Sequence, residues 1–148
     1  MGDRCLKLLA EDEEDLKILS AYLQDAVIRV GDIGYLPRGH RFAVLLNRYR
    51  WEDELEDANC CRRVRAGLHF DGVMRVQVLN IRQDDPESVL ELLAIQFTPT
   101  ADGGGMIDLR CAAGGAIRLH VECIEASLTD IGGPWQARAR PVHDLETG

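Results

Sequence analysis

One segment of the chain has the hydrophobic period of a helix. Leu16, Leu19 and Leu23 fall on one helical face, and polar residues occupy the opposite face. Asp12, directly ahead of the segment, is typical of a helix N-cap. We therefore predict an amphipathic helix over residues 13–24 that packs against a sheet.

The next residues have the composition of strands. Residues 27–36 and 41–48 are rich in β-branched and aromatic side chains, and Pro37-Arg38-Gly39-His40 separates them. Turn residues between two such segments predict a β-hairpin.

Residues 51–59 are mainly acidic and lead into the cysteines and arginines of residues 60–65. This stretch shows neither the hydrophobic period of a helix nor that of a strand, which indicates an exposed connection.

A further strand and a second hairpin are predicted by alternation. In residues 73–81 the apolar side chains include Met74, Val76 and Val78, with polar residues between them. Residues 107–111 and 117–123 alternate in the same way on either side of Gly114-Gly115. We expect both of these glycines to adopt positive φ in a tight turn.

Other segments allow more than one interpretation. Asp85-Pro86-Glu87 resembles a helix start, and residues 89–97 suit either a helical turn entering a strand or a strand throughout. Residues 124–131 suit a continued strand after a bulge or a short helix. Beyond Gly132-Gly133-Pro134 we expect a C-terminal tail over residues 132–148.

These elements together predict the fold class. We expect one α+β domain over residues 1–148, with a mixed, mainly antiparallel sheet and one amphipathic helix packed on it. A length of 148 residues suits one domain with a sizeable core. Within this fold we also consider two pseudo-repeated β-α-β-β units, over residues 5–50 and 73–128.

Composition restricts the partners and the compartment. With 25 acidic and 17 basic side chains the net charge is −8, which makes nucleic acid an unlikely partner. The five cysteines lack the spacing of a disulfide framework, which favours reduced thiols in a cytoplasmic protein. No apolar stretch approaches the roughly 20 residues of a membrane span, and residues 1–7 lack an apolar signal core. We expect no contact with a membrane.

The motifs provide little support for metal or cofactor chemistry. The acidic residues 11–15 suit the positive end of a helix dipole. On a strand, His120 and Cys123 point to opposite faces, which disfavours a shared zinc ion. Strands are predicted after both Gly103-Gly104-Gly105 and Gly114-Gly115, whereas a phosphate-binding loop precedes a helix. We expect neither a metal nor a cofactor; the reactivity of Cys60 and Cys61, beside arginines, stays open.

Arginine and aromatic side chains form the candidate interaction surface. These residue types are enriched at protein interfaces, and arginine also pairs with anions. We predict a non-catalytic binding module whose partner is another cytosolic protein or an anionic small molecule. The candidate surface comprises Arg48, Trp51, Arg62, Arg63, Arg65, His69 and Trp135.

Two other hypotheses stay open. The first is a small enzyme or ligand-binding protein whose site is assembled from distant residues, such as His69, His120 and an acid from Glu122 or Glu125. The second is self-assembly through an unpaired sheet edge.

Four segments carry a resemblance to a known family. They are LQDAVIRVGDIGYLP from Leu23, RFAVLLNRYRWE from Arg41, GLHFDGV from Gly67 and VECIEASLTDIGGPW from Val121. Over nearly its whole length the chain resembles a small alphaproteobacterial family of unknown function. The resemblance implies a bacterial cytosol and attaches no activity, cofactor or catalytic residue.

Overall fold

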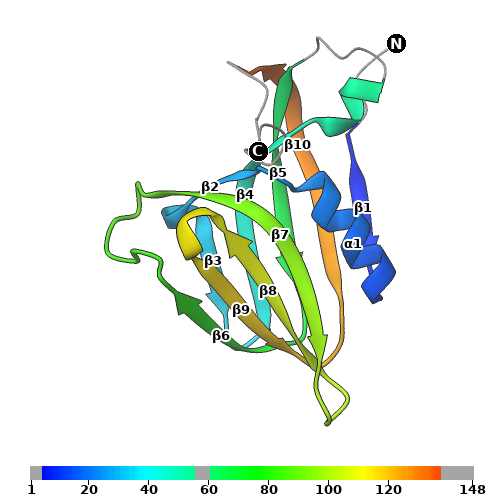
Figure 1. Ribbon diagram of the computed structural model, residues 1–148, viewed down its shortest axis with the longest axis vertical. Helices are drawn as coiled ribbons and strands as arrows, with labels where there is room; N and C mark the ends of the chain where they lie inside the picture. Colours follow the sequence, from blue (N-terminus) through cyan, green and yellow to red (C-terminus); the bar gives the residue numbers. More distant parts are fainter. Residues whose placement is uncertain (1–4, 56–60, 138–148) are drawn as a thin grey trace, which may run out of the picture.

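The computed structural model describes residues 5–55 and 61–137 (Figure 1). In this part of the chain most elements are strands. Their order is β1 (Lys7–Ala10), α1 (Glu13–Tyr22), β2 (Val27–Arg29), η1 (Val30–Asp32), β3 (Ile33–Leu36), β4 (Arg41–Tyr49), η2 (Trp51–Leu55), β5 (Arg62–Phe70), β6 (Val73–Leu79), β7 (Val89–Pro99), β8 (Gly105–Cys111), η3 (Ala112–Gly114), β9 (Ala116–Val121) and β10 (Ala126–Gln136).

The strands form one curled sheet that folds into two facing layers. Its order is β1-β10-β5-β4-β2-β7-β8-β9-β6, and β3 pairs with β4. We call β1, β10, β5, β4 and β3 layer A, and β7, β8, β9 and β6 layer B; β2 links them (Figure 1). The strand pairings in the described part are all antiparallel. The α+β prediction with a mainly antiparallel sheet is confirmed.

The core lies between the layers because strand residues alternate between two faces. Phe42 and Phe70, paired across β4 and β5, are at most 1% exposed, with ring centroids 6.5 Å apart. Ile107 and Leu119, paired across β8 and β9, face them from layer B and are fully buried. Burying one such side chain stabilises the fold by about 1.5–3 kcal/mol.

Helix α1 covers one side of the sandwich, between β1 and β7. Leu16 and Leu19 are 1% exposed, as the predicted helical face requires. The Asp12 carboxylate accepts a hydrogen bond from the Asp15 backbone N–H at 2.8 Å, which confirms the predicted N-cap. The Ser20 hydroxyl accepts one from the Ile95 N–H at 2.9 Å, so this helix is also hydrogen-bonded to β7.

The first hairpin is confirmed, but its first strand is interrupted. β3 and β4 pair on either side of residues 37–40. The one-turn helix η1 separates β2 from β3. The Val30 N–H still donates to the Ser88 carbonyl at 2.8 Å, in register with the pairing of β2 and β7, and the Ile33 N–H then donates to the Val30 carbonyl and closes the turn.

The prediction of an exposed connection before residue 66 is wrong. Residues 51–55 form η2, in which Asp53 is buried, and β5 begins at Arg62 and lies between β4 and β10. Alternate β5 residues from Val64 to Phe70 face the core. Residues 56–60, including Cys60, lie outside the described part of the chain.

The later segments are strands where the sequence allowed helices. β7 is a strand throughout, and Asp85-Pro86-Glu87 starts no helix. β10 continues beyond residue 132, where the tail was predicted to start, and ends at Gln136. Gly132 adopts φ +76°, and the pairing with β5 shifts register between Ile131 and Trp135, so the strand continues after an irregularity. Residues 138–148 lie outside the described part.

The second hairpin and the predicted strand at residues 73–81 are confirmed with three local differences. Ala113 and Gly114, not Gly115, adopt positive φ in the turn. Met74 is 49% exposed because a register shift between Val73 and Arg75 turns it outward. Cys123 is exposed because β9 ends two residues before it.

The proposed repeat is not confirmed. The first unit, residues 5–50, contains α1. Residues 73–128 are described without a gap and contain strands and the one-turn helix η3, with no α-helix.

Candidate functional site

The β-strand alternation divides the predicted interaction surface between two faces. Arg63, Arg65 and His69 occupy alternate positions of β5 and lie on the outer face of layer A. Trp135 of β10 pairs with Arg63 and is 43% exposed. The structure therefore brings these four residues onto one face, and places Arg48 and Arg62 elsewhere.

Arg48 is not part of any surface. It lies on the inner side of β4 with no solvent exposure, and its Nε donates to Asp130 Oδ1 at 2.8 Å. Its Nη2 donates to Glu52 Oε2 at 2.6 Å. Burial favours the neutral form of this guanidinium, but the two carboxylates outweigh burial and raise the pKa of Arg48. Arg48 is a structural residue.

Arg62 and Trp51 attach η2 to the sandwich. Arg62 Nε donates to Asp53 Oδ2 at 3.0 Å, and Arg50 Nε donates to the same oxygen at 2.9 Å. The Trp51 indole N–H donates to the Gln24 carbonyl at 2.8 Å. Burial raises the pKa of the Asp53 carboxyl, but the two arginines outweigh it and hold that pKa below its usual value.

Arg63 is held by neutral groups. Its Nη1 donates to the backbone carbonyls of Asp25 and Asn47, both at 3.2 Å, and its guanidinium lies 5.7 Å from the Tyr49 ring centroid. Burial lowers the pKa of Arg63. The arginine has a fixed position, which suits a structural role at this end of layer A.

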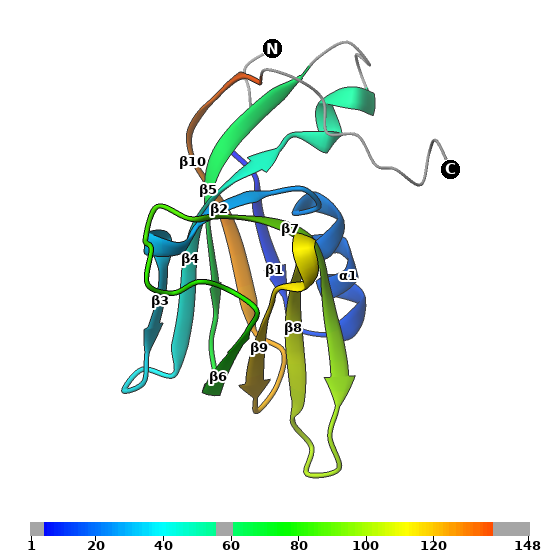
Figure 2. The same ribbon diagram turned by 60° about the vertical axis from the view of Figure 1, so that its left-hand side comes forward.

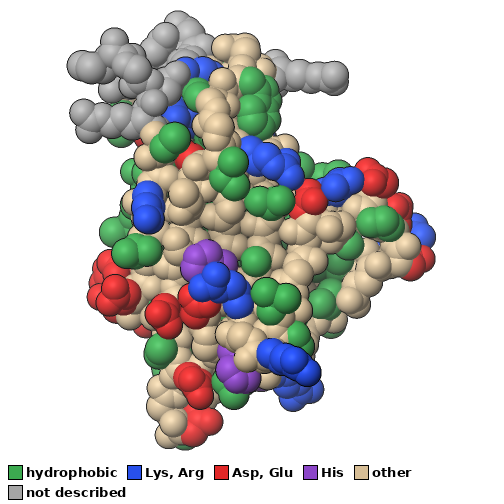
Figure 3. Space-filling model, turned by 180° about the vertical axis from the view of Figure 1, so that it is seen from behind, with side chains coloured by type: hydrophobic (Ala, Val, Ile, Leu, Met, Phe, Trp, Pro, Cys, Tyr) green, Lys and Arg blue, Asp and Glu red, His purple; other side chains and the backbone are tan. Residues whose placement is uncertain are grey.

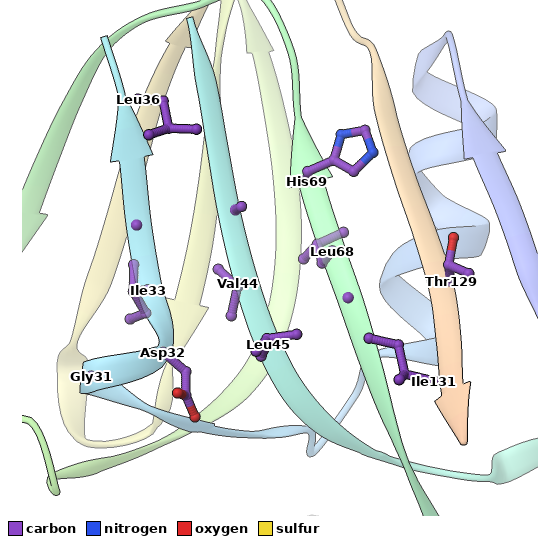
Figure 4. A pocket seen from close by; sticks show the side chains of 13 residues that line it. Gly31, Asp32, Ile33, Leu36, Val44, Leu45, Leu68, His69, Thr129 and Ile131 are labelled. Atoms are coloured by element: carbon purple, nitrogen blue, oxygen red, sulfur yellow. The ribbon is translucent and has the colours of Figure 1, made fainter. Parts of the chain in front are cut away.

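A broad hollow occupies the middle of the outer face of layer A. Its volume is about 610 Å³. Figure 3 shows that backbone and uncharged side chains make up much of this face, and Figure 4 shows Leu45, Ile131 and His69 around the hollow. Strands β3, β4, β5 and β10 all contribute to it. We call the following outward-facing residues of the hollow the binding face: Gly34, Leu36, Ala43, Leu45, Gly67, His69, Thr129 and Ile131.

The binding face departs from the usual pattern of an antiparallel sheet with polar residues on its solvent side. Leu36 is 60%, Leu45 38% and Ile131 47% exposed. On the middle strands of layer B the outer face is polar: Arg118 donates to Asp108 at 2.8 Å, and His120 lies 2.7 Å from Gln77 of the neighbouring strand β6. Exposed apolar side chains of layer B lie on β6 and β7, which flank these strands, with Met74 49%, Leu79 61% and Leu93 40% exposed. In layer A the exposed apolar side chains instead surround one hollow across neighbouring strands.

Ion pairs border the binding face. At one end Arg41 donates to Asp71 at 2.7 Å, and His69 Nδ1 lies 3.4 Å from the same carboxylate. At the other end Asp32 lies between Arg29, at 3.1 Å, and Arg65, at 3.6 Å. The hydrogen bond from Arg29 lowers the pKa of Asp32. Each of these cations is matched by an acid of the chain itself.

The fold does not require glycine at two positions of the binding face, Gly34 and Gly67. A Cβ atom built on Gly34 would meet no atom within 4 Å, and one on Gly67 would make ordinary contacts with Ile131 and Leu45 at 3.6 and 4.0 Å. Neither has positive φ. Gly105 differs, because a Cβ there would collide with the Phe97 ring. Glycine inside a strand often marks close approach of a ligand or another backbone.

The residues of the enzyme hypothesis do not meet. His69 lies on the outer face of layer A, whereas His120 lies on the outer face of layer B. Glu122 and Glu125 are exposed beyond the end of β9. In residues 5–55 and 61–137, no three His, Cys, Asp or Glu side chains are grouped as metal ligands.

The sequence contains a signal for the binding face at positions outside the predicted interaction surface. Ala43 and Leu45 stand at the outward positions of β4, where a polar residue is usual, and Gly67 stands at an outward position of β5. Only the strand register shows that these positions are neighbours, since Leu45 pairs with Gly67 and Gly67 pairs with Thr129.

Comparison with known proteins identifies one family. The family model "Protein of unknown function (DUF2948)" matches residues 6–143, so the chain belongs to this family. No curated protein and no solved structure matches the chain. Among the described helices, none is long and apolar enough to cross a membrane.

Proposed function

We propose that this member of the DUF2948 family is a non-catalytic binding module of the cytoplasm and that the binding face of layer A contacts another protein. The face combines an apolar middle with a border of charged pairs. That arrangement matches the usual anatomy of a protein interface, in which an apolar centre is surrounded by a polar rim.

The observation that carries this proposal is the pair of strand glycines. Glycine in a strand interior destabilises a fold by roughly 0.5–1 kcal/mol relative to alanine. Gly34 and Gly67 incur this cost although the fold has room for a side chain at both positions. A partner whose side chains reach the sheet backbone accounts for them, because any Cβ atom would hold that partner away.

The border favours a protein over an anionic small molecule. Arg41 and Arg65 are matched by Asp71 and Asp32, so the face offers no surplus of positive charge to an anion. The hollow is also open to solvent, whereas small-molecule sites enclose most of their ligand. Large apolar side chains of a partner protein fit both features.

Substitution of Gly67 by leucine tests the proposal. We would isolate the tagged chain from the cytosol of its own host cells and identify retained proteins by mass spectrometry, comparing wild type, Gly67→Leu and a matched control, Thr98→Leu. Thr98 is exposed on β7 in layer B, so its variant also adds one surface leucine. A protein retained by wild type and Thr98→Leu but lost with Gly67→Leu is the expected result.

Three outcomes would contradict the proposal. They are retention of no protein by the wild type, equal retention by Gly67→Leu, and a bound metabolite in place of a protein. A dimer of the purified chain that Gly67→Leu dissociates would also overturn the choice of a foreign partner.

A further inference from the structure

In the described part of the chain, the side of the sandwich opposite α1 is covered by no helix or strand, and the connection between β6 and β7, which includes Ile81 and Gln83, runs along it. Helix α1 closes the side between β1 and β7, whereas β3 and β6 border the other side (Figure 2). Ile33 and Tyr35 of β3, with Val76 of β6, pack against the core there and are only partly buried. The core is therefore less completely covered on this side.

A crevice of about 280 Å³ lies between these two strands. Its lining is largely apolar and includes Ile33 and Tyr35 from layer A and Val76 and Val78 from layer B. The Tyr35 hydroxyl donates to the Val73 carbonyl at 2.8 Å. The volume suits one or two apolar side chains.

Both strands beside the crevice are edge strands. β6 pairs with β9 alone, and β3 pairs with β4 alone. In an antiparallel ladder, alternate residues direct their N–H and C=O groups away from the partner strand. Apart from the ladder with β9, no described residue is hydrogen-bonded to the backbone of residues 74–79. Such an edge is a template for another strand.

Basic side chains gather at one end of this edge. The His40 carbonyl accepts a hydrogen bond from the Val73 N–H at 2.8 Å; Arg38 lies two residues before His40 and Arg75 two residues after Val73. All three basic side chains are exposed, and none forms an ion pair with another described residue. The Arg38 and Arg75 guanidinium groups at this end, near the exposed Glu122, are therefore available to acidic side chains of a partner.

We propose that the free edge of β6 binds an extended acidic peptide segment as an added strand. Backbone hydrogen bonds to residues 75–79 align the segment, and its alternate apolar side chains enter the crevice beside Val76 and Val78. Its acidic residues lie beside Arg38 and Arg75. This peptide site does not depend on the binding face of layer A.

Selection from a display library of random twelve-residue peptides on the immobilised full chain tests this site. We expect the enriched peptides to alternate apolar and polar residues and to carry acids near one end. Their affinity, measured by fluorescence anisotropy at low salt, should fall about tenfold or more in Arg38→Glu/Arg75→Glu. The amides of residues 74–79 should exchange with solvent about tenfold more slowly when peptide is bound.

The control is Arg110→Glu, on the outer face of layer B, which reverses one exposed charge away from the edge. It should leave the affinity within about twofold. Absence of enriched peptides, equal affinity in Arg38→Glu/Arg75→Glu, or unchanged exchange at residues 74–79 would each overturn the proposal. Peptides that Gly67→Leu displaces and the double variant does not would assign the binding to layer A instead.

Discussion

At the scale of single residues, Arg48 shows how a charged side chain becomes part of a fold. Its guanidinium joins β4 to β10 through Asp130 and to η2 through Glu52, with no access to solvent. Asp130 also accepts a hydrogen bond from the Leu6 N–H at 3.1 Å. Removing one partner of a buried charge pair leaves the other charge uncompensated.

We predict that Arg48→Met destabilises the fold by about 3–5 kcal/mol, because it leaves the buried Asp130 carboxylate without its cation. Urea unfolding followed by circular dichroism measures this loss. Arg48→Met/Asp130→Leu should recover a substantial part of it, since both charges are then absent. A single variant within about 1 kcal/mol of wild type would show that the pair is not structurally important.

Because the Asp53 carboxylate is ionised in the folded state, we predict that the free energy of unfolding falls in acid. The pKa of Asp53 is lowered in the folded state, so its contribution is complete above the unfolded value of about 4 and is lost as pH falls through the folded value. Asp53→Asn should cost roughly 1.5–3 kcal/mol at pH 7. It should also reduce the fall in unfolding free energy between pH 6 and pH 3. Asp84→Asn, at a carboxylate 76% exposed, is the control and should leave that pH profile unchanged.

At the scale of elements, the sequence predicted what local periodicity determines. α1 and the β3–β4 and β8–β9 hairpins were found because their side chains repeat at fixed spacing or lie on either side of turn residues. β5 was missed because arginines fill its first positions and an acidic segment precedes it. Its central place depends on pairing with β4 and β10, which are distant in the chain.

The packing of helix α1 on the sheet can be tested by substitution on its two faces. Leu19 is 1% exposed beneath the helix, and its neighbour Ile18 is 54% exposed. We expect Leu19→Ala to lower the free energy of unfolding by about 2–5 kcal/mol, because it leaves a cavity between α1 and the sheet. Ile18→Ala should change it by about 0.5 kcal/mol or less. If chemical denaturation shows the same loss of unfolding free energy for Leu19→Ala and Ile18→Ala, the packing of Leu19 beneath α1 is contradicted.

At the scale of the whole molecule, the candidate site was only partly predictable. Of the predicted surface, Arg63, Arg65, His69 and Trp135 lie on the outer face of layer A, and among these four only His69 belongs to the binding face. The hollow beside them was not predicted, because Gly34, Ala43, Gly67 and Thr129 come from four strands and meet only through register. Individually, each looks like an ordinary small residue, and only the three-dimensional arrangement shows the shared open surface.

The stability and the binding of Gly67→Ala, measured together, test the central claim most directly. We predict that this variant unfolds with a free energy about 0.5–1 kcal/mol higher than wild type, while its affinity for the isolated partner protein falls about fivefold or more. Gly105→Ala, at a glycine that the fold requires, should lose stability. A Gly67→Ala variant that is less stable than wild type, or that binds the partner equally well, would contradict the assignment of a binding face to layer A.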